Sequence, residues 1–195
     1  MYHTRLLQDR TFYATLARFD EDLAAEVRAR GCPCGGRLHR ADYPRKPRGG
    51  PADLGPTYDW RHSFCCDREG CRHRATPASL RFLGRRVYLG VVVVLVSIMA
   101  HGLTGARLTT LRDTLGGSLS VRTIGRWRTW WHQAFPHSPF WRQARGRFAP
   151  PVDRDRLPAA LLARFRGSTL AVRVQQLLAF LAPLTVPGAG SVRAG

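Results

Sequence analysis

Five cysteines lie in two short groups, and their spacing constrains the fold of this 195-residue chain more than any other feature. The first group is Cys32 and Cys34, and the second is Cys65, Cys66 and Cys71. Two tight turns that each present a pair of thiolates are typical of structural zinc sites, in which four ligands surround the ion as a tetrahedron. We therefore predict that the two groups meet in the folded protein.

The second group offers three thiols for two ligand positions. Between Trp60 and Cys66, successive side chains of a strand would point to opposite faces. One face would carry Trp60, His62, Phe64 and Cys66, and Cys65 would lie on the other. The choice of Cys66 over Cys65 depends on this alternation alone. The predicted zinc ligands are Cys32, Cys34, Cys66 and Cys71.

Disulfides and inert buried thiols are the alternatives to a metal site. Disulfides need an oxidising compartment, and the sequence that begins at Met1 lacks the charged, apolar and small-residue pattern of a secretory signal. We therefore expect a cytoplasmic protein. The apolar run 87–100 has 14 residues, whereas a membrane-spanning helix needs about 20. It is expected to form a buried helix without a membrane partner, although its four consecutive valines also suit a buried strand.

The charge of the chain favours a nucleic-acid partner. The formal net charge is +18, and 30 of the 31 basic residues are arginine, whose planar guanidinium suits phosphate and guanine. Residues 1–31 carry five basic and five acidic side chains, whereas residues 32–86 carry twelve and five. The positive excess therefore begins at the cysteine module, after a neutral helical segment that ends near Gly31.

A basic loop lies between the two cysteine groups. Its many prolines and glycines, over residues 43–56, exclude a helix or a central strand. Arg45, Lys46 and Arg48 lie in this loop. Two interpretations remain open, a loop that grips DNA phosphates and a solvated hairpin tip.

A second motif spans residues 108–131. Leu108, Leu111 and Leu115 mark a short helix, two glycines interrupt it, and Ser120 can cap a second helix. The predicted apolar face of the second helix consists of Val121, Ile124, Trp127 and Trp131. The predicted DNA contacts of this segment are Ser118, Arg122, Thr123, Arg126 and Thr129. The pattern predicts a helix-turn-helix whose second helix enters the major groove, with a plain helical hairpin as the alternative.

The residues from Thr123 to Trp127, after a Leu-Gly turn, resemble the start of the recognition helix in bacterial insertion-sequence transposases. Such transposases often carry an N-terminal zinc ribbon, so the resemblance covers residues 32–135. It also implies an RNase H-like domain with three acidic residues that hold two metal ions. After Glu69, however, the only acidic residues are Asp113, Asp153 and Asp155. We therefore expect a protein that is not an enzyme, either derived from a transposase or accessory to one.

The expected fold class is mainly α, with a small β zinc ribbon and a helix-turn-helix bundle. The expected domains are a helical segment at 1–31, the zinc ribbon at 32–86, the helix-turn-helix at 87–135, a basic Pro-rich linker at 136–151, a helical pair at 152–186 and a disordered tail at 187–195. Double-stranded DNA is the expected partner, and a separate transposase subunit or a second copy of the chain are further candidates. Two other functions stay open: a transcriptional regulator with a defined operator, and a zinc-ribbon adaptor that binds another protein.

Overall fold

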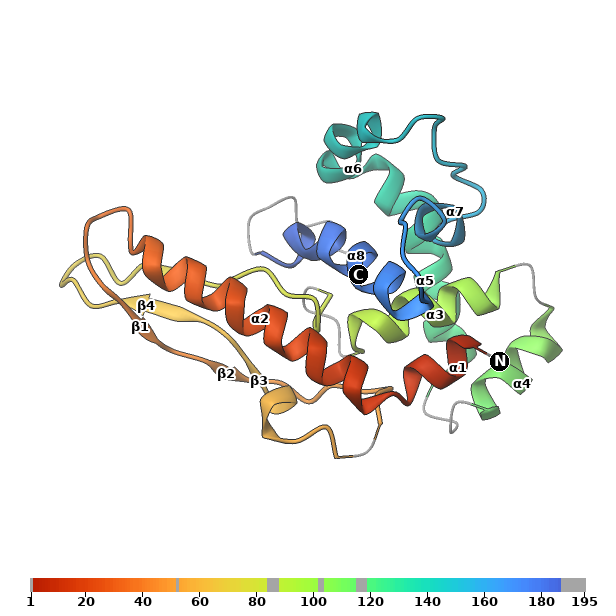
Figure 1. Cartoon of the computed structure of the whole chain (residues 1–195), viewed down its shortest axis with the longest axis horizontal. Coiled ribbons are helices and arrows are strands. Elements are labelled where there is room, and N and C mark those ends of the chain that lie inside the picture. Colours follow the sequence, from red (N-terminus) through yellow and green to blue (C-terminus); the bar gives the residue numbers. More distant parts are fainter. Residues whose placement is uncertain (1, 52, 84–87, 102–103, 115–118, 187–195) are drawn as a thin grey trace.

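A computed structural model describes residues 2–51, 53–83, 88–101, 104–114 and 119–186. The protein is mostly helical with a small antiparallel β region, in agreement with the coarse fold prediction. Helices gather around one apolar helix, and the strands extend from them alongside the long helix α2 (Arg10–Arg30) (Figure 1). The predicted disordered tail, 187–195, lies outside the described residues.

The N-terminal segment forms helices α1 (Tyr2–Leu7) and α2 (Arg10–Arg30). The Asp9 carboxylate caps α2 by accepting a hydrogen bond from the Phe12 amide at 3.2 Å. Gly31 ends α2 with a φ of 75°, which belongs to the left-handed region that glycine adopts without strain. The predicted end of the helical segment at Gly31 is therefore confirmed.

Two small antiparallel sheets follow. Strands β1 (Leu38–Arg40), β4 (Phe64–Cys66) and β5 (Arg74–Ala75) form one, and β2 (Tyr43–Pro44) pairs with β3 (Trp60–Arg61) in the other. The predicted alternation from Trp60 to Cys66 holds only within β4. Arg61, His62 and Ser63 are all buried and Trp60 is 46% exposed, because the chain leaves one sheet and enters the other at His62 and Ser63.

Helix α3 (Gly90–Ala100) lies at the centre of the bundle. Its side chains from Val91 to Val96 are at most 1% exposed. A helix surrounded on all sides needs no polar face, which explains the uninterrupted apolar run. The predicted helix is thus confirmed over the strand alternative. Among the described helices, none combines the length and the apolar composition that crossing a membrane requires.

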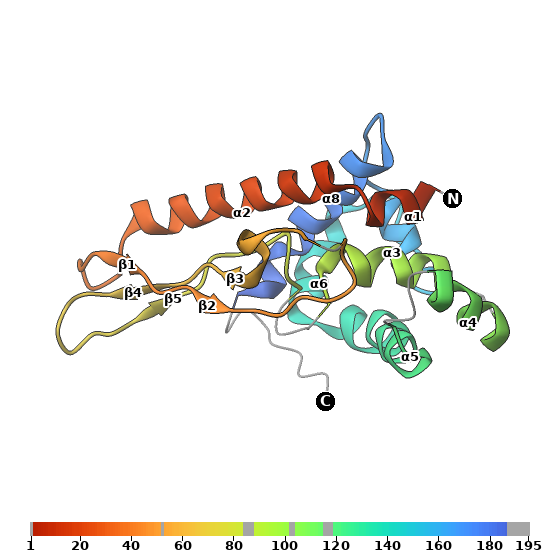
Figure 2. The ribbon, with the colours of Figure 1, turned by 90° about the horizontal axis from the view of Figure 1, so that it is seen from below.

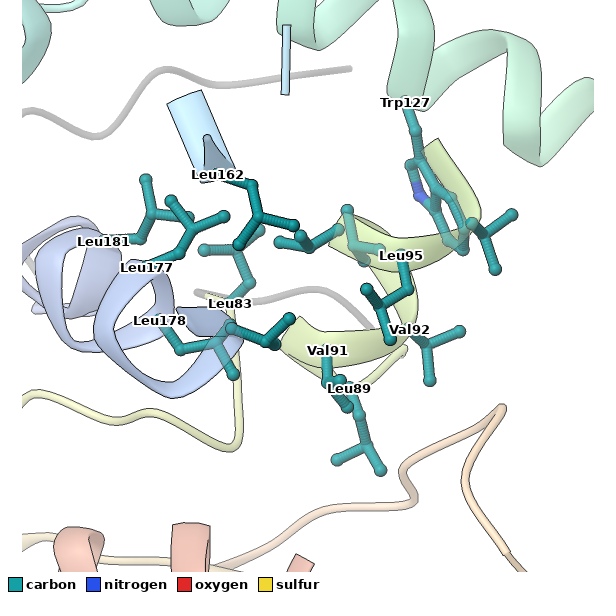
Figure 3. Packing of buried hydrophobic residues seen from close by; sticks show 14 of the residues in the cluster. Leu83, Leu89, Val91, Val92, Leu95, Trp127, Leu162, Leu177, Leu178 and Leu181 are labelled. Carbon is teal, nitrogen blue, oxygen red and sulfur yellow. The ribbon is translucent and has the colours of Figure 1, made fainter. Parts of the chain in front are cut away.

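Besides α1, three further helices pack against α3: α4 (Gly105–Thr114), α5 (Val121–Thr129) and α8 (Leu170–Leu181). Figure 3 shows Leu177, Leu178 and Leu181 of α8 on one side of α3, and Trp127 of α5 on another. One face of α8 belongs to the core, because Val174 and these three leucines are all buried. The short helix α7 (Ala159–Leu162) precedes α8, and a 3-10 turn (Ala182–Thr185) follows it.

The prediction of a basic Pro-rich linker at 136–151 is wrong in its secondary structure, because a helix forms within it. Helix α5 continues through a π-helical turn (Trp130–Ala134) and a 3-10 turn (Phe135–His137) into α6 (Pro139–Ala144), which Ser138 caps. Trp141 is 2% exposed and its ring lies 5.0 Å from that of Phe135. Pro139 follows the cap in the first turn of α6, a position that favours a helix start, and burial of the aromatic rings stabilises the helix.

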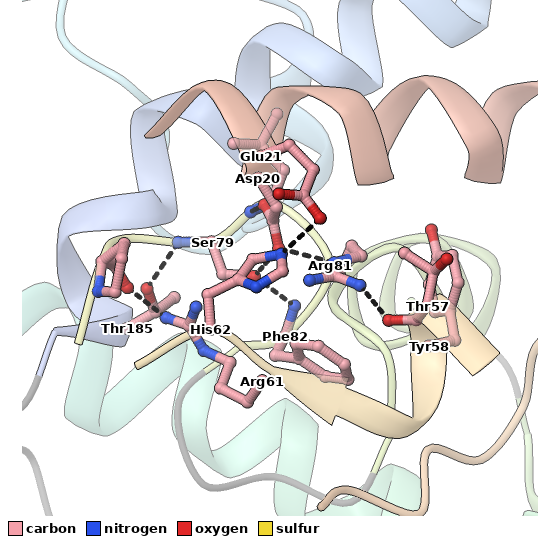
Figure 4. A network of polar contacts seen from close by, with 12 residues as sticks. Asp20, Glu21, Thr57, Tyr58, Arg61, His62, Ser79, Arg81, Phe82 and Thr185 are labelled. Atoms are coloured by element: carbon pink, nitrogen blue, oxygen red, sulfur yellow. Dashed lines mark hydrogen bonds and ion pairs between the residues drawn. The ribbon is translucent and has the colours of Figure 1, made fainter. Parts of the chain in front are cut away.

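A buried polar layer separates two hydrophobic clusters. The larger cluster surrounds α3, and the smaller one joins the end of α2 to the cysteine strands. Asp20 lies between them, fully buried, and accepts hydrogen bonds from the Leu80 amide at 2.6 Å and from Arg81 Nε at 2.7 Å. Figure 4 shows this network, which ties α2 to residues 79–82. The Ser79 amide donates to Thr185 Oγ1 at 2.9 Å and links the C-terminal turn to the same layer.

Candidate metal centre and exposed basic helix

Four thiols converge at the end of α2. The Sγ atoms of Cys32, Cys34, Cys66 and Cys71 all lie within 4.8 Å of one another, with Cys32 to Cys71 at 3.8 Å and Cys34 to Cys66 at 3.5 Å. A tetrahedral ion with metal–sulfur bonds of about 2.3 Å requires sulfurs about 3.8 Å apart. The cluster therefore has the dimensions of a four-thiolate metal site. Within the described ranges, no other group of three or more potential ligands comes together in this way.

The backbone around the first pair forms a tight turn. The Gly35 amide donates to the Cys32 carbonyl at 2.8 Å, and the Cys32 amide donates to the Gly36 carbonyl at 3.1 Å. A Cβ at Gly36 would lie 2.5 Å from Cys66 Sγ, a separation that atoms do not tolerate. Glycine at this position is therefore what allows the two cysteine groups to approach each other.

The second pair comes from the end of β4 and the turn that follows it. Leu38 of β1 pairs with Cys66, which brings the β4 end close to the first turn, and the Cys71 amide donates to the Arg68 carbonyl at 3.1 Å. Cys65 Sγ instead lies 3.9 Å from the Arg72 carbonyl, outside the cluster. The predicted set of four clustered cysteines is confirmed, with Cys66 rather than Cys65.

Two of the clustered thiols, Cys34 and Cys66, differ in pKa. A hydrogen bond from the Gly36 amide, followed by those from the neighbouring thiols, lowers the pKa of Cys34 to about 6. Burial raises the pKa of Cys66 to about 12. In the absence of a metal, Cys34 therefore loses its proton at a lower pH than Cys66 does. A divalent cation would hold all four as thiolates, since thiolate is the form that binds metal.

Helix α5 presents a basic face. Ser120 Oγ caps the helix by accepting a hydrogen bond from the Thr123 amide at 3.1 Å, as predicted. Ile124 and Trp127 are buried, whereas Arg122, Arg126 and Thr129 are exposed along one side. Their exposure on the face opposite the core matches the sequence pattern.

The predicted apolar face of α5 needs one correction. Val121 is 40% exposed, whereas Leu119, just before the cap, is buried. Leu119 and Ile124 occupy the two positions of a hydrophobic staple, where a residue preceding the cap packs with the fourth residue of the helix. Leu119 thus anchors the start of α5 in place of Val121.

The prediction that Thr123 contacts DNA also needs correction, because Thr123 does not lie on the exposed face of α5. It is 6% exposed. Its hydroxyl lies 2.9 Å from Ser120 Oγ and accepts a hydrogen bond from Arg126 at 3.3 Å. Thr123 therefore orients Arg126 and cannot itself reach a DNA groove in this arrangement. Ser118, also predicted to contact DNA, lies outside the described residues.

The basic loop packs against the protein more closely than a solvated tip would. The guanidinium carbon of Arg45 lies 5.4 Å from the centre of the Phe82 ring, a cation–π contact. Arg48 forms a β-bridge with Tyr88. Lys46 and Arg48 are exposed, so two of the three predicted phosphate contacts remain accessible.

The buried carboxylate of Asp20 is not among the residues predicted from the sequence. A signal for it exists, because Phe12, Leu16, Asp20 and Ala24 follow one another at intervals of four residues, which places them on one helix face. An acid at an apolar position of this kind indicates a buried ion pair. Its partner, Arg81, could not be identified in the same way, since it lies in an irregular segment.

Comparison with protein-family models, with curated proteins and with solved structures finds no match to this chain. The resemblance to transposases therefore depends on the residues of the second helix and on the order of the two modules. The cysteine cluster and the basic helix are therefore the features of this chain that bear on its function.

Proposed function

We propose that this protein binds double-stranded DNA through α5, that zinc stabilises its cysteine module, and that it is a non-catalytic protein derived from a transposase or accessory to one. The observation that carries the proposal is the capped, well-packed helix α5, whose outward side bears Arg122 and Arg126. Arginines at this spacing can donate two hydrogen bonds each to guanine acceptors in the major groove.

The arrangement of α4 and α5 supports a helix-turn-helix. Both helices contact α3 and each other, and α5 follows α4 in the chain. In a helix-turn-helix, the second helix buries one side against its neighbours and lays the other in the groove. The formal net charge of +18 supplies the long-range attraction to a phosphate backbone.

Zinc is the metal that we propose for the cysteine cluster. Four thiolates in a tetrahedron are the usual donor set of structural zinc, and they leave no open coordination position for a reacting water. The zinc would therefore hold β1, β4 and the end of α2 together without taking part in a reaction. Native mass spectrometry should detect one zinc ion per chain, and a chain purified without any metal would contradict this assignment.

Selection of duplexes from a random library tests the DNA-binding proposal. The wild-type protein should enrich a defined sequence, and the double variant Arg122→Ala, Arg126→Ala should relax the preference at two positions. The matched control is Arg18→Ala with Arg28→Ala, which removes the same charge from exposed positions of α2. In Figure 2, α2 and α5 lie on opposite sides of the molecule. Equal sequence preference in all three proteins would contradict the role of α5.

The selected site also separates the two DNA-binding interpretations. A palindrome with half-sites one helical turn apart would indicate a dimeric transcriptional regulator. A single asymmetric site would fit recognition of a transposon end. An adaptor that binds only protein would enrich no sequence.

A further inference from the structure

Gly125 lies in the interior of α5 without a reason in the protein's own packing. None of the described residues, apart from its helix and chain neighbours, has an atom within 4 Å of a Cβ built at this position. Its φ is also outside the left-handed region that would require glycine. Gly90, by contrast, faces Leu178 at 3.3 Å. Because glycine in a helix interior is less favourable than alanine, the fold alone would be more stable with a side chain at residue 125.

Gly125 is exposed, and so are most of its neighbours on the helix surface. On a helix, its nearest surface neighbours are the residues three and four positions away and the adjacent residue on the same side. The residues three and four positions away are Val121, Arg122, Arg128 and Thr129, and the adjacent residue is Arg126; Arg128 is half-buried and the other four are exposed. Gly125 is therefore the one position without a side chain at the centre of the basic face.

Close approach of a partner explains a glycine at such a place. A missing side chain lets another molecule come nearer to the helix backbone than any other residue permits. Since the same face carries two arginines and the chain is strongly basic, the partner that fits is an anion with hydrogen-bond acceptors between its charges. The major groove of DNA has this character.

We propose that Gly125 marks the point of closest approach between α5 and the base-pair edges of the DNA major groove. This inference rests on the proposed function. Without a Cβ at residue 125, the helix lies deep enough for Arg122 and Arg126 to reach guanine acceptors in bidentate geometry. Val121, which is 40% exposed, then offers an apolar surface of the kind that meets a thymine methyl group.

The test is Gly125→Ala, with Gly125→Leu as a larger probe. Affinity is measured by fluorescence anisotropy for the duplex selected by the wild-type protein and for a scrambled duplex of the same composition, and thermal unfolding is recorded for each protein. The control is Gly146→Ala, because Gly146 also has open space at its Cβ position among the described residues but lies in the turn Arg145–Arg147, which follows α6 and is not part of α5.

We expect Gly125→Ala to raise the melting temperature by about 2–4 °C, because alanine favours the helix. Gly125→Ala should weaken binding to the selected duplex by about tenfold or more and leave binding to the scrambled duplex unchanged. Gly125→Leu should weaken binding to the selected duplex further. Gly146→Ala should bind as the wild type does.

Wild-type affinity in Gly125→Ala would overturn the inference and leave the proposed function standing. An equal loss on both duplexes would also overturn it, since phosphate contacts alone would then be disturbed. No binding of wild-type protein to any duplex would overturn the proposed function itself.

Discussion

The ring of Trp127 meets the ring of Tyr88 edge-on, with centroids 5.1 Å apart and planes at 81°. Tyr88 forms a β-bridge with Arg48 of the basic loop, and the next amide, that of Leu89, donates to the Arg48 carbonyl at 3.3 Å. One aromatic contact therefore connects the basic loop to α5. Two segments to which the sequence assigns DNA contacts separately are joined across the start of α3.

Trp127→Ala should strongly destabilise the protein. Removing a buried aromatic side chain of this kind costs about 3–5 kcal/mol, because apolar burial is lost and a cavity remains. Trp127 is buried against α3, whereas Val121 in the same helix is exposed. Val121→Ala is therefore the control and should change the free energy of unfolding by less than about 0.5 kcal/mol. Urea unfolding of both variants measures the difference, and equal stability would argue against this packing of α5.

Asp20→Ala should destabilise the protein almost as much as Trp127→Ala does. Arg81 is fully buried beside the Asp20 carboxylate at 2.7 Å, and removing one partner of a buried pair leaves the other charge uncompensated, at a cost of about 3–5 kcal/mol. Asp22→Ala, two residues later on the exposed side of α2, provides the comparison and should be nearly neutral. Thermal unfolding at neutral pH is the measurement. Equal melting temperatures of the two variants would show that the buried polar layer does not hold the two hydrophobic clusters together.

Metal affinity should rise with pH. The pKa of Cys66 is about 12, so this thiol must lose a proton whenever it binds the metal in the neutral range. The pKa of Cys34 is about 6, so this thiol must lose a proton on metal binding only below about pH 6. Each proton released on binding makes the affinity change about tenfold per pH unit. The slope should therefore become steeper below the pKa of Cys34. Chelator competition at several pH values measures it, and a pH-independent affinity would exclude thiol ligands.

Chelation should unfold the cysteine module while leaving the bundle folded. The smaller cluster contains few apolar side chains besides the cysteines themselves, whereas the larger cluster around α3 has its own extensive core. Hydrogen exchange after chelator treatment should show lost protection in β1, β4 and β5 and retained protection in α3 and α8. Cys66→Ser should reproduce this pattern and Cys65→Ser should not. Loss of protection throughout the chain would show that the two clusters fold as one unit.

Local patterns in the sequence predicted much of the fold. The cap at Ser120, the helix end at Gly31 and the choice of Cys66 all follow from short-range rules, and each is present in the structure. The choice of Cys66 succeeded although the alternation behind it holds only from Phe64 to Cys66, because that short stretch decides which thiol points toward Cys34.

Features that depend on tertiary contacts could not be predicted in this way. The start of α6 has a local signal in the cap Ser138 followed by Pro139, but the contact that fixes the helix in the fold, Phe140 against Phe180 of α8, is tertiary. The pairing of Asp20 with Arg81 joins residues 61 positions apart, and no local pattern specifies it. Burial of Thr123 likewise depends on how α5 sits on its neighbours, which periodicity alone does not determine.

Salt-dependent DNA binding tests the central claim most directly. Affinity for the selected duplex would be measured over a range of salt concentrations for the wild type, the Arg122→Ala, Arg126→Ala variant and the Arg18→Ala, Arg28→Ala control. Wild-type and control proteins should show the same steep decline in affinity with salt, because each phosphate neutralised contributes about 0.9 to the slope of log affinity against log salt. The α5 variant should bind more weakly at every salt concentration. Binding that does not respond to salt, or an α5 variant that binds as the wild type does, would contradict DNA recognition by this helix.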